Sequence, residues 1–250
     1  LTPWKKITKI ILQTNKEIKI AIIGKYVELK DAYKSLDEAL THGGIANNLK
    51  VNLVRIESDY LKPKDVKNKL KEVSGILIPG GFGKRGTEGK IAAITYARKN
   101  NIPFLGICFG MQMAVIEFAR NRLNIRNATS SEFGPSKGSV VGLMSEWIKD
   151  GKLMKGTDKE LGGTMRLGSY EARLKKGSLI NSIYKSAKIF ERHRHRYEVN
   201  INFKDKFEDK GMIFSGLSPN MKLPEIIELK NHPWFIGVQF HPEFKSRPLA

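Results

Sequence analysis

Short apolar segments alternate with helix-favouring segments along the first half of the chain. The apolar segments are rich in isoleucine, leucine and valine, a pattern that predicts buried strands. The predicted strands are residues 18–24, 51–56, 75–81 and 102–107, and the predicted helices are residues 31–47, 63–73, 88–99 and 109–122. Strands and helices that alternate at this spacing indicate βαβ units and a parallel sheet covered on both faces.

The second half of the chain is richer in strand-like segments. Strands are predicted at residues 164–172, 189–192, 213–217, 225–229 and 235–240, with a polar, glycine-rich surface loop at residues 151–163. The predicted fold class is α/β, an open and mostly parallel sheet with helices on both faces and a strand-rich second half. Residues 1–17 are polar and lysine-rich, and we expect them to be a linker that precedes a domain of residues 18–250.

The formal net charge of +19 suggests a polyanionic partner at first sight. However, the lysines are scattered along most of the chain and often stand beside acidic residues, as in residues 67–72. No helix-turn-helix, zinc-finger or aromatic-rich RNA-binding motif accompanies them. No segment approaches the roughly 18 continuous apolar residues that would span a bilayer. We therefore expect neither nucleic acid nor membrane as a partner.

The only cysteine of the chain lies in the segment Phe104-Leu105-Gly106-Ile107-Cys108-Phe109-Gly110-Met111-Gln112. A lone cysteine excludes an internal disulfide framework, so that it is either an inert core residue or a nucleophile. Here Gly-x-Cys-x-Gly places the thiol on a sharp strand-to-helix turn, which the flanking glycines make possible. The helix N-terminus favours the reactive thiolate. We therefore expect Cys108 to be a catalytic nucleophile.

A base for this nucleophile is expected at His241, in the segment Gln239-Phe240-His241-Pro242-Glu243-Phe244. Pro242 fixes the backbone between His241 and Glu243. The carboxylate can then accept a hydrogen bond from one imidazole nitrogen while the other nitrogen faces Cys108. The rival bases lack this position at a strand end with a carboxylate two residues further on; they are His42, His193, His195 and His232. The predicted catalytic residues are thus Cys108, His241 and Glu243.

A glycine turn follows the third predicted strand, in the segment Ile78-Pro79-Gly80-Gly81-Phe82-Gly83. Acyl transfer builds negative charge on a carbonyl oxygen, and backbone N–H groups must point at that oxygen. We expect the N–H groups of Gly81 and Phe109 to form this oxyanion hole. A Walker-type phosphate loop is disfavoured because no Gly-Lys-Ser/Thr follows. No metal-ligand spacing is present, and the arginines of residues 191–196 disfavour a bound cation.

The three motifs occur in the order of residues 79–83, 106–112 and 241–244. In this order they resemble the class I, triad-type glutamine amidotransferases. More narrowly, residues 24–35, 191–200 and 231–235 are similar to segments of the CTP synthase family, and the likeness covers roughly residues 18–247. The resemblance implies the amidotransferase fold and a glutaminase activity.

The resemblance also implies a reaction and a substrate site. Cys108 would attack the side-chain amide of L-glutamine, ammonia would leave, and water would hydrolyse the thioester to glutamate, with His241 moving protons and Glu243 orienting it. Of the residues implied to bind glutamine, Glu132 would meet its ammonium group and Arg196 its carboxylate, since a zwitterion needs one charge of each sign opposite it. The full set is Gly81, Phe109, Gly110, Met111, Gln112, Glu132 and Arg196.

In the CTP synthase family, the ammonia passes to an N-terminal synthetase domain that aminates UTP to CTP in pyrimidine biosynthesis. The resemblance therefore implies a cytoplasmic ligase that needs ATP and Mg²⁺ in that domain, takes GTP as an allosteric activator and forms a homo-oligomer, a tetramer at full length. Residues 1–17 would be the linker from that domain. No cofactor is expected within residues 18–250, and Phe82 and Arg85 are hypothesised to contact GTP.

Two alternatives stay open from the sequence. An amidotransferase subunit of another biosynthetic enzyme, or a γ-glutamyl hydrolase, would carry the same triad, and the segment Arg-His-Arg-His-Arg-Tyr of residues 192–197 favours CTP synthase. A basic binding module that kept the fold without the activity is the second alternative. The intact Cys108, His241 and Glu243 speak against it, because such a module has no physical need for all three.

Overall fold

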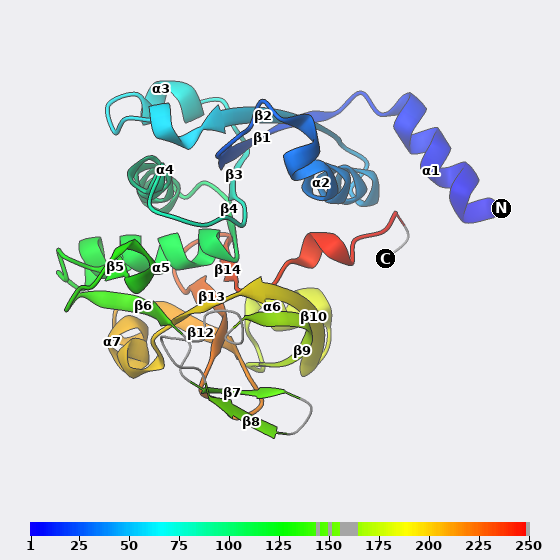
Figure 1. Ribbon diagram of the computed structural model, residues 1–250. Helices are drawn as coiled ribbons and strands as arrows, with labels where there is room; N and C mark the ends of the chain where they lie inside the picture. Colours follow the sequence, from blue (N-terminus) through cyan, green and yellow to red (C-terminus); the bar gives the residue numbers. More distant parts are fainter. Residues whose placement is uncertain (144–145, 150–151, 156–164, 249–250) are drawn as a thin grey trace.

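Five apolar segments form the parallel part of the central sheet (Figure 1). The computed structural model describes residues 1–143, 146–149, 152–155 and 165–248. Neighbouring strands in this part are parallel, in the spatial order β2 (Lys50–Glu57), β1 (Glu17–Gly24), β3 (Gly75–Ile78), β4 (Phe104–Ile107) and β14 (Phe235–Val238). Strands β3 and β14 are buried along their whole length, which their uninterrupted apolar sequences allow.

The second half of the chain extends this sheet with antiparallel strands. Beyond β14 the order continues with β13 (Pro224–Leu229), β12 (Met212–Leu217), β9 (Arg166–Leu174) and β10 (Lys188–His195), so that the described strands give a nine-stranded sheet. The predicted strands of the second half all fall within these elements or overlap them. The α/β fold class with a strand-rich second half is confirmed.

Helices cover both faces of the sheet. Figure 1 shows α2 (Lys34–Ala46) and α6 (Leu179–Tyr184) on one face, and α3 (Val66–Leu70), α4 (Thr87–Lys99), α5 (Phe109–Arg122) and α7 (Lys204–Asp209) on the other. The alternation of side chains along β1 separates the two cores: Ala21 and Ile23 join the cluster beneath α4 and α5, while Ile22 joins the cluster beneath α2.

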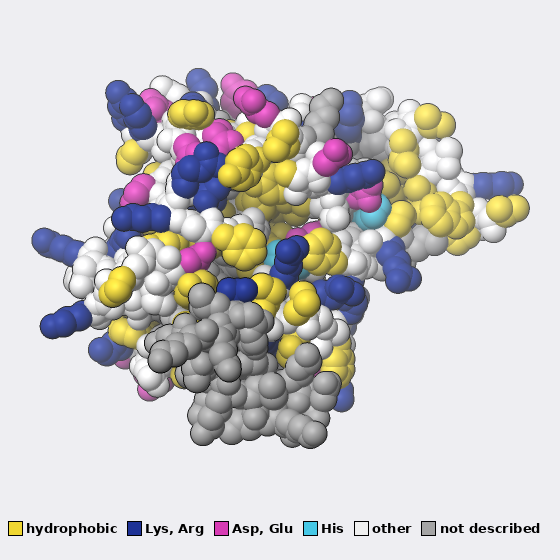
Figure 2. All heavy atoms as spheres, viewed as in Figure 1, with side chains coloured by type: hydrophobic (Ala, Val, Ile, Leu, Met, Phe, Trp, Pro, Cys, Tyr) yellow, Lys and Arg dark blue, Asp and Glu magenta, His cyan; other side chains and the backbone are white. Residues whose placement is uncertain are grey.

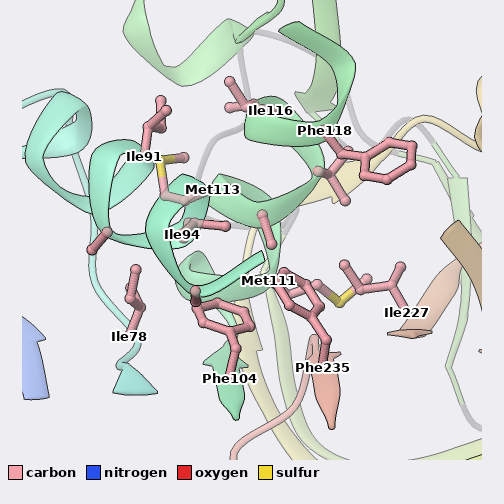
Figure 3. Close-up of a cluster of buried hydrophobic side chains, with 14 of the residues drawn as sticks. Ile78, Ile91, Ile94, Phe104, Met111, Met113, Ile116, Phe118, Ile227 and Phe235 are labelled. Atoms are coloured by element: carbon pink, nitrogen blue, oxygen red, sulfur yellow. The ribbon is translucent and has the colours of Figure 1, made fainter. Parts of the chain in front are cut away.

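The helix that follows the predicted nucleophile, α5, runs through the centre of the larger core. Figure 3 shows Met111 of this helix beside Phe235, whose ring stacks on Phe104 of the neighbouring strand with centroids 4.3 Å apart. One charged group is buried with it: Glu117 accepts a hydrogen bond from Arg98 at 2.7 Å and others from Thr95 and Asn121. A buried carboxylate paired in this way avoids the cost of an unpartnered charge.

A smaller sheet stands beside the large one. It contains β5 (Thr129–Ser130), β6 (Ser139–Leu143) and β11 (Tyr197–Val199), and a separate hairpin pairs β7 (Glu146–Lys149) with β8 (Lys152–Lys155). The predicted loop of residues 151–163 is therefore wrong for residues 152–155, because these four pair with β7 as a strand. The remainder of that predicted loop lies outside the described residues.

The expected linker begins with a helix, α1 (Thr2–Gln13). The helix packs on α2, and Ile7 is its one residue that the described structure buries, while Trp4 and Leu12 are 54% and 77% exposed. Figure 2 shows hydrophobic side chains on the projecting end of the molecule, where Figure 1 shows α1. The domain boundary near residue 17 stays a prediction. No helix in the described part of the chain is both long and apolar enough to cross a membrane.

We expect Phe235→Ala to lower the free energy of unfolding by about 3–5 kcal/mol, because it removes a buried ring from the stack with Phe104. Phe190 on β10 is 49% exposed, and the matched change Phe190→Ala should stay within about 0.5 kcal/mol. Urea denaturation followed by circular dichroism measures both. Equal losses in the two variants would contradict this placement of the core.

Candidate active site

Cys108 occupies the turn between β4 and α5 in a strained backbone conformation. Its φ and ψ are 51° and −103°, and a positive φ is unfavourable for a residue with a side chain. The strand beside it holds the strained residue in place, because the N–H of Cys108 donates to the carbonyl of Val238 at 2.6 Å. The turn is therefore a nucleophile elbow of the kind that the Gly-x-Cys-x-Gly pattern predicts.

The two flanking glycines are required by close backbone contacts. A Cβ on Gly106 would lie 2.7 Å from the carbonyl group of Gly110, and a Cβ on Gly110 would collide with the carbonyl oxygen of Ile78. These contacts bring the first turn of α5 against both β4 and β3. The positive end of the helix is thereby fixed beside Cys108.

The thiol of Cys108 is buried, with 3% of the residue exposed. Its Sγ lies 4.0 Å from the carbonyl oxygen of Arg194, and Gln239 Nε2 donates toward the sulfur at 3.7 Å. The sequence analysis did not identify Gln239 or the Arg194 carbonyl as neighbours of the sulfur. A polar Gln239 at the end of an apolar strand was the signal that would have singled it out.

The imidazole of His241 is paired with Glu243, as the His-Pro-Glu spacing predicts. Nδ1 of His241 lies 2.7 Å from Oε1 of Glu243, and the backbone N–H of His241 donates to the carbonyl of Arg192 at 2.8 Å. Burial lowers the pKa of His241, but hydrogen bonds to Cys108 and Glu243 and their charges outweigh burial and raise it to about 10.

The glycine turn after β3 completes one cavity with these residues. The cavity has a volume of about 270 Å³, and its lining includes Gly80, Gly81, Cys108, His241 and Glu243. A Cβ on Gly80 would lie 2.6 Å from Cε1 of His241, so that Gly80 is packed directly against the imidazole. The N–H of Phe109 stands in the first turn of α5, where helical N–H groups have no partner within the helix. The three predicted motifs thus converge on one site.

Of the residues predicted to bind glutamine, one lines the cavity and others are buried in helix α5. Gly81 lines the cavity, whereas Gly110, Met111 and Gln112 are buried in α5. Gln112 Nε2 donates to the carbonyl of Tyr197 at 2.9 Å. The side chain of Met111 lies in the apolar core, so that only its backbone is available to a ligand.

Glu132 and Arg196 lie beside the smaller sheet, and neither is among the residues that line the cavity of Cys108. Glu132, in the turn after β5, accepts a hydrogen bond from the N–H of Gly83 at 2.7 Å, and burial raises the pKa of its carboxyl group. Burial, followed by the charge of Glu132, raises the pKa of Tyr197, and the charge of Arg196 lowers it. Nε of Arg196 is buried without a hydrogen-bond partner among the described residues.

The other histidines have partners away from the sulfur. Nδ1 of His42 lies 3.0 Å from Oγ of Ser246, and Nε2 of His232 lies 3.2 Å from the carbonyl of Ala97. His193 and His195 are buried on the inner face of β10 and contact each other. Of the five histidines, His241 is the one that lines the cavity of Cys108.

A second pocket lies on the other side of the Gly80–Gly81 turn. Its volume is about 370 Å³, and its lining includes Lys25, Phe82, Lys90 and Phe109. Burial, then the charge of Lys25, lowers the pKa of Lys90 to about 8, and Lys90 Nζ donates to Oγ of Ser58 at 2.7 Å. The sequence analysis did not single out these lysines, because nothing separates them from the many surface lysines. Figure 2 shows basic side chains scattered over this face.

The two residues of the GTP hypothesis differ in their surroundings. Phe82 is 59% exposed, while Arg85 forms an ion pair with Asp59 at 2.9 Å and lies over the ring of Tyr26 at 4.7 Å. Among the described residues, no group of three or more His, Cys, Asp or Glu side chains is arranged to hold a metal ion.

The family model for class-I glutamine amidotransferases matches residues 28–250. The chain therefore belongs to the class-I glutamine amidotransferase family. The glutaminase domain of CTPS from Trypanosoma brucei, solved with bound acivicin, superposes with a TM-score of 0.83 at 35% identity, over 93% of this chain and 88% of that one. Within the family, the chain thus belongs with the glutaminase domains of CTP synthases.

Curated relatives point the same way. The chain is 76% identical over all 250 residues to a CTP synthase of Pelagibacter ubique and 59% identical to one of Rhizobium johnstonii, covering 46% of each. It therefore spans about half the length of the curated relatives it matches. A glutamine amidotransferase of Thermotoga maritima, at 14% identity and a TM-score of 0.51, covers 90% of this chain and 76% of that one and shows the shared fold alone.

We expect Gly80→Ala to lower the pKa of His241 from about 10 toward its ordinary value, because the added methyl group displaces the ring from Cys108 and Glu243. Gly81→Ala is the matched control, since its Cβ would meet nothing closer than Phe109 Cδ1 at 3.9 Å. An NMR titration of the imidazole resonances, assigned with a His241→Asn variant, measures the pKa. The same shift in both variants would show that Gly80 does not hold the ring.

Proposed function

We propose that the chain hydrolyses L-glutamine to glutamate and ammonia, with Cys108 as nucleophile. The observation that carries this proposal is the strained Cys108 beside the His241–Glu243 pair in one cavity. A cysteine nucleophile needs a base and a group that orients the base, and both stand within reach.

In the first half of the proposed reaction, Sγ of Cys108 attacks the carbonyl carbon of the glutamine side-chain amide. The C–N bond then breaks, and His241 donates the proton with which the nitrogen leaves as ammonia. Negative charge gathers on the carbonyl oxygen during the attack, and the N–H groups of Gly81 and Phe109 stabilise it. The product of this half is a γ-glutamyl thioester on Cys108.

In the second half, water attacks the thioester carbonyl while His241 accepts a proton from the water. The C–S bond breaks and glutamate leaves. The proton stays with Cys108 and His241, which restores their starting state. Glu243 stabilises the imidazolium form of His241 through the hydrogen bond to Nδ1. The sum of both halves consumes one water and one glutamine and yields one glutamate and one ammonia.

Recognition of the amino-acid end of glutamine falls to Glu132 and Arg196 in this proposal. The two side chains carry opposite charges, and both charges act on Tyr197. Nε of Arg196 is buried without a hydrogen-bond partner among the described residues, so that the carboxylate is bound by the rest of the guanidinium group in this proposal. Gly110, Met111 and Gln112 contribute through the backbone of α5.

The fate of the ammonia follows from the CTP synthase family. We infer that the remainder of the protein is a synthetase domain that uses ATP and Mg²⁺ to aminate UTP to CTP, with GTP as activator. The full-length protein is then a cytoplasmic homo-oligomer, and residues 1–17, helix α1 included, connect the two domains. This proposal rests on the relatives named CTP synthase, of which the chain covers 46%.

We expect acivicin to form one covalent adduct on residues 1–250, at Cys108, and excess glutamine to suppress it. The relative from Trypanosoma brucei binds this compound, and the thiol here is the only one in the chain. Intact-mass and peptide mass spectrometry identify the adduct, with Cys108→Ser as the control. If labelling is absent, the experiment is repeated on the full-length protein with ATP, UTP and GTP. Absence there as well would refute the proposed nucleophile.

We expect Arg196→Met to weaken the binding of glutamine by about 2–5 kcal/mol, because the substrate carboxylate loses its charged partner. Glutamine should then protect Cys108 less well from acivicin labelling. Arg126→Met, at an exposed position, is the matched control and should leave protection unchanged. The measurement is the glutamine concentration that halves the rate of acivicin labelling. Unchanged protection in Arg196→Met would assign the carboxylate to a different residue.

A further inference from the structure

Five ionisable side chains form a buried cluster behind the candidate active site. Arg166 of β9 donates to Glu198 Oε1 at 3.0 Å and to Glu225 Oε1 at 2.8 Å. His193 and His195 of β10 complete it, with Nδ1 of His193 2.8 Å from Nε2 of His195 and Nε2 of His193 3.6 Å from Glu225 Oε2. The proposed reaction uses none of these five residues.

With both histidines neutral, the cluster has one cation for two carboxyl groups. Burial lowers the pKa values of both histidines well below the ordinary range, with Arg166 adding to the effect, so that both are neutral near pH 7. Arg166 alone then faces two carboxyl groups. Burial raises the pKa of Glu198 to about 8 and also raises the pKa of Glu225, in both cases against the opposing charge of Arg166, so that the two carboxyl groups share one proton at neutral pH.

Two buried carboxyl oxygens support the conclusion that the cluster holds one proton at neutral pH. Oε2 of Glu198 and Oε2 of Glu225 are buried and have no hydrogen-bond partner among the described residues. A buried, unpartnered carboxylate oxygen is costly, whereas a protonated carboxyl group removes the net negative charge.

The cluster holds the strand that borders the cavity of Cys108. Side chains alternate along β10, so that His193 and His195 point inward while Arg192 and Arg194 face outward. The carbonyl of Arg192 accepts from the N–H of His241 at 2.8 Å, and the carbonyl of Arg194 lies 4.0 Å from Cys108 Sγ. Each of these carbonyls is thus next in sequence to a histidine that the cluster fixes.

Arg166 also joins the two sheets at this point. Its partner Glu198 stands on β11 of the smaller sheet, and its partner Glu225 stands on β13 of the large one. Arg196 lies between His195 and β11, in the short connection from one sheet to the other. The same smaller sheet contains β5, which leads directly to Glu132.

We propose that this cluster is a positioning device for glutamine, which fixes residues 192–196 and the smaller sheet relative to Cys108. The inference rests on the proposed glutaminase function. Arg166, His193, His195, Glu198 and Glu225 are positioning residues that act through Arg196, Glu132 and the two carbonyls of β10. The proton held by the cluster keeps its charge balanced and thereby couples glutamine affinity to pH.

The test compares two buried ion pairs in residues 1–250 and in the full-length protein. Arg166→Met breaks the cluster, and Arg98→Met breaks the pair with the buried Glu117 on the α4–α5 side of the core. Both variants should lose thermal stability. The glutamine concentration that halves acivicin labelling should rise about tenfold or more in Arg166→Met, because small misplacements of binding groups are costly, and stay within about twofold in Arg98→Met.

The pH dependence provides the second readout. Glu198 contacts Arg166 of β9 and His195 of β10, and the charge of Glu225 of β13 acts on it. Within the cluster, Tyr170 faces Arg166 and His193, and the charge of His241 acts on both histidines. Its folded-state pKa is raised, so that its contribution to stability is full below its ordinary value and is lost as the pH rises toward about 8. Glu198→Gln keeps the shape of the protonated acid and cannot lose that proton.

We therefore expect glutamine to protect Glu198→Gln from acivicin labelling as well as it protects the wild type at pH 7. At pH 9, where wild-type Glu198 is ionised, glutamine should protect the variant better than the wild type. Equal pH profiles for the two proteins, or equal loss of protection in Arg166→Met and Arg98→Met, would overturn the positioning role. If Arg166→Met does not fold, the comparison between the pH profiles of Glu198→Gln and the wild type decides alone. Wild-type labelling that glutamine fails to suppress would instead refute the proposed function itself.

Discussion

The close backbone contact between α5 and β3 is the constraint on which the site depends. Gly110 stands against the carbonyl oxygen of Ile78, and Gly106 stands against the first turn of the helix, with no room for a side chain at either position. This contact fixes where α5 begins, and it holds Cys108 at a positive φ between two buried strands. The same contact sets the helix N-terminus opposite the turn at Gly80, so that Cys108, His241 and the turn at Gly80 and Gly81 are held together around one cavity.

Three histidines near Cys108 show how the surroundings of one residue type determine its chemistry. His241 has a thiol and a carboxyl group as neighbours, and its pKa is raised to about 10 although burial opposes the rise. His193 and His195 stand on the buried face of β10, where burial and the charge of Arg166 lower their pKa values. Arg194 of the same strand lines the cavity of Cys108, while the buried face presents neutral imidazoles that serve packing and hydrogen bonding.

The sequence predicts the fold class and the motifs that meet at the cavity of Cys108, because both depend on local patterns. Apolar segments bounded by glycine locate β1, β3 and β4, and Gly-x-Cys-x-Gly locates the elbow to the residue. Helix α1 and strand β8 were not predicted, since their formation depends on packing or pairing with partners elsewhere in the chain. The buried cluster around Arg166 was missed for the same reason: its charges come from four strands, and no spacing in the sequence links them.

The isolation of Cys108 has a consequence for oxidative damage. Oxidation of a cysteine yields a sulfenic acid, which a neighbouring thiol can trap as a disulfide and so rescue from further oxidation. Within these 250 residues there is no second cysteine to act as that resolving thiol. Protection of Cys108 from peroxide within this part of the protein therefore falls to its burial, with 3% of the residue exposed.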